Sequence, residues 1–151
     1  MLNRLLAVLV FAAMSVTAAN ANEQVNSAFK RIDEQGLQRL KRPNFLHDER
    51  AANKQALAEI ETLNSDLNGL SPSELVSVIK LCREQVHKIP SDSKHFLYAD
   101  YHNQAILFSI GDLGKQKTDA AKKALDEVKP LISGAAQLQE SWDEAKAKQS
   151  E

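Results

Sequence analysis

The sequence predicts an all-α protein, an antiparallel helical bundle of four to five helices. Three observations support this fold class: glycines and prolines fall between segments in which apolar residues recur at helical spacing, β-branched residues are few, and no segment alternates apolar and polar residues for more than a few positions. Because the connections between successive helices are short, we expect consecutive helices to be antiparallel neighbours. The chain has 151 residues, of which 43% are hydrophobic, enough for one compact domain.

The first 21 residues have the pattern of a secretory signal peptide. Arg4 supplies a short positive region, residues 5–14 form an unbroken apolar run, and residues 19–21 place alanines at the two positions that signal peptidase reads. A membrane anchor is the alternative, but the uncharged stretch of residues 5–19 is shorter than the roughly 20 residues that a spanning helix needs. A cleaved signal peptide is therefore the prediction.

Cleavage is expected between Ala21 and Asn22, leaving residues 22–151 as a single helical-bundle domain in the bacterial periplasm or secreted from the cell. Both methionines of the chain, Met1 and Met14, lie in the removed segment. Because the exported domain would contain no methionine, methionine-based copper sites and His/Met haem ligation are excluded. The lack of a CxxCH sequence excludes covalently attached c-type haem. We predict no cofactor.

The first two helices are predicted over about residues 23–40 and 44–68. Pro43 stops the first helix because proline cannot continue it, and Gly69 suits the position that ends the second. The apolar residues expected to face the core are Val25, Phe29, Ile32, Gly36 and Leu40 in the first helix and Ala52, Ala56, Ile60, Leu63 and Leu67 in the second.

The third helix has the clearest boundaries. Ser71, Pro72 and Glu74 form a capping box with proline at the first helical position, and Pro90 ends the helix. Cys82 lies on its apolar stripe, so we expect a buried structural thiol, with a reactive or intermolecularly paired cysteine as the alternative. The stripe consists of Leu75, Val78, Ile79, Cys82, Val86 and Ile89.

The fourth helix, predicted over about residues 92–113, is apolar on nearly all of its faces. Such a helix either lies at the centre of the bundle or presents one face to a partner. For the second case, the candidate interface residues are Tyr101, Ile106, Phe108 and Ile110.

The fifth helix is predicted from about Thr118 onward, with an apolar stripe that stays in phase across Pro130. Because proline removes one helical hydrogen bond, we expect one C-terminal helix with a kink near Pro130, and two separate helices are the alternative. The stripe consists of Ala121, Leu125, Val128, Ile132, Ala135, Leu138, Trp142 and Ala145.

Histidine offers a candidate metal site at the turn between the third and fourth helices. His87 closes one helix, while Asp92 and His95 open the next, so a helical hairpin would bring all three to one end of the bundle. His95 and His102 share a face but are separated by roughly 10 Å along the helix, too far apart to bind one ion together. The sequence therefore offers His87, Asp92 and His95 as a weak site for a divalent transition metal.

No catalytic motif accompanies these features. The chain has no GxSxG or SxxK sequence and no Gly-rich phosphate loop, and its 19 basic and 20 acidic residues give no strongly basic surface for nucleic acid. We therefore expect a non-enzymatic protein that binds another exported or envelope protein, as an inhibitor, immunity-type protein, adaptor or accessory factor; a homodimer is left open. The alternatives are transition-metal binding or sensing at the site above and a carrier of small apolar ligands with a cavity beside the fourth helix.

Overall fold

The computed structural model describes residues 22–41, 49–92 and 94–151, and every regular element in that part of the chain is helical. The predicted all-α class is confirmed. The predicted signal peptide lies outside the described residues. The elements are an N-terminal helix over residues 22–40, α2 (Glu49–Leu67), α3 (Pro72–Lys88), α4 (Phe96–Lys115), α5 (Asp119–Val128), the short 3₁₀ helix η1 (Lys129–Ile132) and α6 (Ala136–Ser150).

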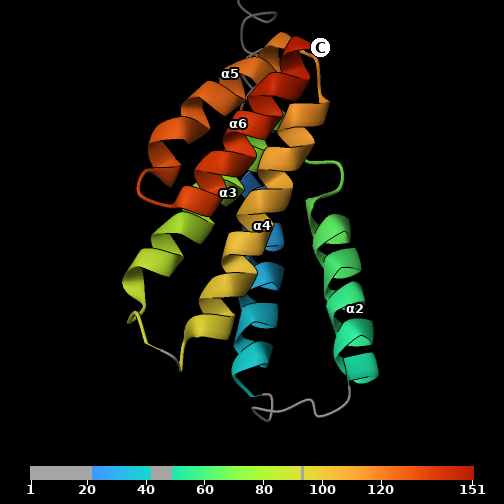
Figure 1. Ribbon diagram of the computed structural model, residues 1–151, viewed down its shortest axis with the longest axis vertical. Coiled ribbons are helices and arrows are strands. Elements are labelled where there is room, and N and C mark those ends of the chain that lie inside the picture. The colour runs from blue at the N-terminus through green and yellow to red at the C-terminus, as the bar shows by residue number, and fades with distance from the viewer. Residues whose placement is uncertain (1–21, 42–48, 93) are drawn as a thin grey trace, which may run out of the picture.

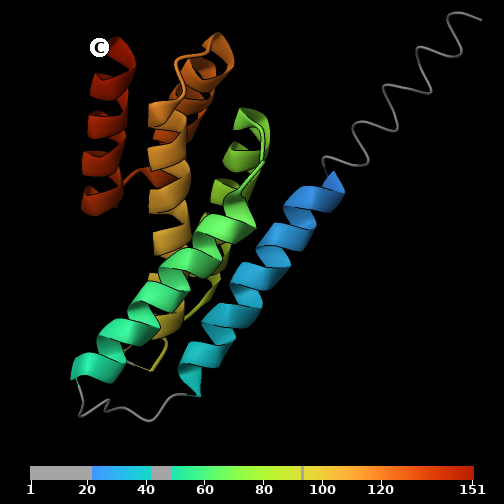
Figure 2. The same cartoon turned by 90° about the vertical axis from the view of Figure 1, so that its right-hand side faces the viewer.

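Helix α4 lies in the middle of the molecule and packs against α2, α3, α5 and α6 (Figure 1). Helices α5 and α6 gather around its C-terminal half, while the connection from α3 lies at the opposite end. The N-terminal helix and α2 lie side by side along the other part of the molecule (Figure 2). None of the described helices combines the length and the apolar character that a bilayer crossing requires.

The central position of α4 explains its apolar character. Tyr101, Ile106 and Ile110 are fully buried in the core, so their prediction as interface residues is wrong, because neighbouring helices cover the faces on which they lie. Phe108 is partly buried and packs against the same core. The interpretation of this helix as central is the one that the structure supports.

The capping box of α3 forms as the sequence predicts. The Ser71 hydroxyl accepts a hydrogen bond from the backbone N–H of Glu74, and a Glu74 carboxylate oxygen accepts one from the backbone N–H of Ser71, 2.6 Å away. Cys82 is a fully buried free thiol on this helix. Its predicted place in the core is confirmed.

The C-terminal segment forms two helices where the sequence favoured one kinked helix. Helix α5 ends at Val128, the chain continues as the short helix η1 around Pro130, and Gly134 then turns the chain with a φ of +81° before α6. Proline contributes no N–H to continue the helical ladder, and a glycine readily adopts positive φ. The apolar stripe nevertheless stays directed at the core on both helices, and its buried members are Ala121, Leu125, Val128, Ile132, Leu138 and Ala145.

Helix α2 buries less of its predicted stripe than expected. Leu63 and Leu67 are buried, whereas Ala56 and Ile60 are exposed, and Leu40 on the neighbouring N-terminal helix is exposed as well. Helical periodicity gives the face that turns toward the core but not the length over which other helices cover it. The two helices are also joined by ion pairs, which are described below.

Candidate functional site

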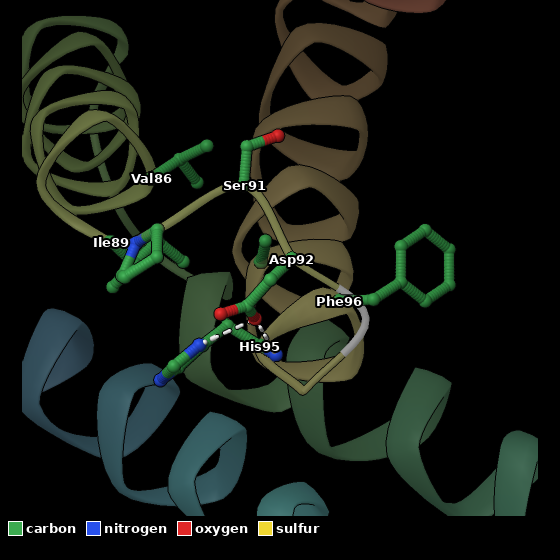
Figure 3. Close-up of a pocket in the computed structure, with 8 residues that line it drawn as sticks. Val86, Ile89, Ser91, Asp92, His95 and Phe96 are labelled. Atoms are coloured by element: carbon green, nitrogen blue, oxygen red, sulfur yellow. Dashed lines mark hydrogen bonds and ion pairs between the residues drawn. The ribbon is translucent and has the colours of Figure 1, made fainter.

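A pocket of about 500 Å³ opens between the C-terminal end of α3 and the first turn of α4 (Figure 3). We refer to it as the α3–α4 pocket. Its lining is mainly apolar, with a few polar groups at the connection between the helices. The lining residues are Val86, Ile89, Pro90, Ser91, Asp92, His95, Phe96 and Ala99.

The local sequence explains why α3 ends beside this pocket and how the chain enters α4. Ile89 precedes Pro90 and is extended (φ −91°, ψ 150°), since a residue before proline avoids the helical conformation, and α3 therefore ends at Lys88. On the other side of the connection, a carboxylate oxygen of Asp92 accepts hydrogen bonds from the backbone N–H of His95 (3.0 Å) and from its ring Nδ1 (2.7 Å). These two bonds fix the chain as it enters α4.

Phe96 is the most exposed large apolar side chain of the described residues, at 64%. In Figure 3 its ring points away from Val86 and Ile89, toward solvent. The exposed large apolar residues belong to the second half of the N-terminal helix, the middle of α2 and the start of α4: Leu37, Leu40, Leu57, Ile60, Phe96 and Leu97. Grouped exposed apolar side chains on a small protein are typical of interaction surfaces.

The predicted metal ligands are brought together in part. Asp92 and His95 are paired, whereas His87 is exposed, and among the described residues no group of three or more His, Cys, Asp or Glu side chains is placed to hold a metal ion. The hydrogen bonds from His95 lower the pKa of Asp92 below its usual value, so that this carboxyl group is ionised at neutral pH. Ser91 does not extend the pair, because its hydroxyl points away from His95 in Figure 3.

A buried ion-pair cluster centred on Arg39 was not predicted from the sequence. Its guanidinium contacts the carboxylates of Glu59 (2.6 Å) and Asp100 (2.8 Å), and it lies 4.7 Å from the centre of the Tyr101 ring. Arg39 also donates to the backbone oxygen of Leu97. The cluster joins the N-terminal helix to α2 and α4. Because the partners are distant along the chain, no local pattern could have revealed it.

A second link between the N-terminal helix and α2 lies about two turns away. The Nε of Arg31 donates to a carboxylate oxygen of Asp66 over 2.8 Å. The two arginine–acid pairs together set the register of these helices, since residues 31 and 39 on one helix face residues 66 and 59 on the other.

The only cysteine is not part of a nucleophile–base pair. Burial is the main factor that raises the pKa of Cys82 to about 12, so the thiol is neutral at physiological pH. The buried His102 uses both ring nitrogens for other contacts, with the backbone oxygen of Tyr98 and the carboxylate of Asp33. Neither ring nitrogen of His102 is therefore free to accept the thiol proton.

Of the residues that line the α3–α4 pocket, the sequence drew attention to Asp92 and His95, and it offered a cavity beside the fourth helix as an alternative without placing it at this end of the helix. The feature of the sequence that could have located the pocket is the apolar stripe of α3. This stripe continues through Val86 and Ile89 to the end of the helix, and both residues line the pocket. Comparisons of the sequence with protein-family models, with curated proteins and with solved structures found no match.

Proposed function

We propose that this chain is an exported, non-enzymatic protein of the bacterial periplasm that binds another envelope protein through the α3–α4 pocket. The observation that carries the proposal is the mainly apolar pocket of about 500 Å³ beside the exposed ring of Phe96. The signal-peptide pattern of the first 21 residues supports export. In this proposal the scaffold is an antiparallel bundle, since short connections join helices that pack side by side.

The size and chemistry of the pocket suit apolar side chains of a partner. Its volume falls within the range of about 300–1,000 Å³ typical of binding pockets. An aromatic side chain buries about 150–250 Å² in total, so covering the exposed 64% of Phe96 gains about 2–4 kcal/mol. A contribution of that size is characteristic of the aromatic anchor at the centre of an interface.

The test uses two similarly exposed apolar positions. A photo-crosslinking residue at position 96 is expected to capture a partner in the periplasm, and the same residue at position 57 serves as the control, because Leu57 is 62% exposed but does not line the pocket. The dissociation constant of the captured partner is then measured with purified proteins.

We expect Phe96→Ala to weaken binding at least 30-fold, and Leu57→Ala to change it less than threefold. Both variants leave the buried core unchanged, so circular dichroism should show wild-type helicity. Equal effects of the two substitutions, or none from Phe96→Ala, would place the interface elsewhere and refute the proposal.

A second candidate function is transport of a small apolar ligand in the same pocket. The mainly apolar lining beside the first turn of α4 favours it. It predicts a lipid or fatty acid in native mass spectra of the purified protein and binding of dodecanoic acid in a calorimetric titration. Ala99→Phe, which fills the pocket, should abolish that binding; a wild-type protein that neither retains nor binds such a ligand excludes this function.

A further inference from the structure

A polar contact that involves a buried histidine joins the N-terminal helix to α4. His102 of α4 is fully buried. Its ring Nδ1 lies 2.9 Å from the backbone oxygen of Tyr98, and its Nε2 lies 3.1 Å from a carboxylate oxygen of Asp33 on the N-terminal helix. Both ring nitrogens therefore face oxygen atoms.

The neighbouring hydrogen bonds decide which atoms can donate. A backbone carbonyl oxygen accepts hydrogen bonds and cannot donate them. The same is true of an ionised carboxylate. The Tyr98 hydroxyl donates to the same Asp33 oxygen that faces His102, and the side-chain amide of Gln85 donates to the Tyr98 hydroxyl over 2.9 Å. This oxygen of Asp33 therefore already acts as an acceptor, for the Tyr98 hydroxyl.

A neutral imidazole has one N–H and can satisfy only one of these two contacts. The other nitrogen of this fully buried ring would then present a lone pair to an oxygen lone pair, which is unfavourable. We propose that His102 is held in the folded protein as an imidazolium that donates from both ring nitrogens, forming a proton-dependent clamp between the N-terminal helix and α4.

Gly36 supports the clamp by allowing the two helices to approach closely. A Cβ atom at this position would lie 3.0 Å from Cε1 of His102 and 3.1 Å from Cδ2 of Tyr98, closer than ordinary van der Waals contact. The glycine one turn after Asp33 thus brings the carboxylate within reach of the ring.

The titratable groups around His102 come from each helix that packs there. The N-terminal helix contributes Asp33 and α4 contributes Tyr98. Helix α3 contributes Cys82, which lies within electrostatic range of Asp33 and Tyr98. Burial, followed by the hydrogen bond to Asp33, raises the pKa of Tyr98 above its usual value, and the pKa of Cys82 is about 12. Both groups are therefore neutral near pH 7, and Asp33 is the charge that faces the imidazolium.

The sign of the pH effect follows from the proton count. Folding takes up one proton wherever the histidine of the unfolded chain is neutral, above about pH 6.5. Raising the pH therefore weakens the clamp, because one of the two ring hydrogen bonds needs that proton.

The protonation state is tested directly by nitrogen-15 NMR of the histidine rings in the full exported chain at pH 7. We expect two ring N–H signals for His102, both protected from exchange. In Asp33→Asn, an amide at position 33 can donate to the lone pair of a neutral ring, so one of the two N–H signals is lost. A single ring N–H for His102 in the wild-type protein would overturn the proposal.

The second measurement is the equilibrium constant of urea unfolding between pH 6.5 and 8.5. In the wild type this constant should rise by up to about tenfold per pH unit, as for one proton released on unfolding, and Asp33→Asn should remove that rise. Asp126→Asn is the matched control, because the Lys146–Asp126 pair is at the surface and contains no histidine, so its loss should leave the slope unchanged. A wild-type slope no steeper than that of Asp33→Asn would also overturn the proposal, whether or not a partner binds the α3–α4 pocket.

Discussion

Of the glycines in the described part of the chain, Gly114 of α4 leaves the least room for a side chain. A Cβ atom added there would lie 2.7 Å from Cβ and 2.8 Å from Cα of Ala145 on α6. Carbon atoms prefer separations of about 3.5–4.0 Å, so Gly114→Ala forces α4 and α6 apart by about 1 Å. Because part of the obstruction is backbone, a change of side-chain rotamer cannot relieve it.

The expected cost is that of overpacking a well-filled core, about 1–3 kcal/mol of unfolding free energy. Gly111 provides the control on the same helix, because a Cβ atom there meets nothing within 4 Å. Alanine at that position should stabilise the helix by about 0.5–1 kcal/mol relative to glycine. The two variants, each a single added methyl group, should therefore differ by about 1.5–4 kcal/mol.

Urea unfolding followed by far-UV circular dichroism measures this difference, with equal slopes in denaturant as the check that both variants unfold in the same way. Adding Ala145→Gly to the Gly114→Ala variant should recover part of the loss, since it removes the nearer of the two obstructing atoms. If Gly114→Ala proves as stable as Gly111→Ala, the two helices are not in contact at this position and the packing of α6 on α4 must be revised.

Three further predictions concern buried polar groups. Arg39→Ala should cost about 3–5 kcal/mol in urea unfolding, because it removes the guanidinium from a buried ion pair with Glu59, whereas Arg31→Ala at a half-exposed pair should cost about 1 kcal/mol or less. The pKa of about 12 means that folded Cys82 keeps its proton where the unfolded chain loses it, so unfolding free energy should fall between pH 9 and 12, and Cys82→Ala should remove this part of the fall. Trp142→Phe should lose about 1 kcal/mol on thermal unfolding, since its indole N–H donates to a backbone oxygen of α5 over 2.6 Å.

The features that the sequence predicted correctly depend on neighbouring residues. The capping box at Ser71 and Glu74 needs three consecutive peptide units, and the apolar stripe of α3 places Cys82 in the core by periodicity alone. The all-helical class follows from the same periodicity. In these cases local propensity and tertiary packing favour the same conformation.

The features that the sequence missed depend on residues far apart in the chain. Arg39 meets Glu59 and Asp100 at separations of 20 and 61 residues, and Asp33 meets His102 at a separation of 69. Spacing rules for a single helix contain no information about such pairs. At Pro130 two local rules competed, and the missing N–H outweighed the continuity of the apolar stripe.

The position of the α3–α4 pocket on the fold bears on its ability to bind. One wall begins with Phe96 and Ala99, and the same helix continues into the core, where Tyr101 and Ile106 are fully buried. The backbone of such a helix is already ordered, so a partner that covers its side chains does not have to order the backbone, and more of the burial energy appears as affinity. Leu57 is equally exposed but lies on a helix whose nearest buried apolar residue is Leu63, nearly two turns away. Phe96 and Leu57 therefore differ as binding positions although their exposure is similar. The pocket wall on α4 is the one that continues directly into the buried core.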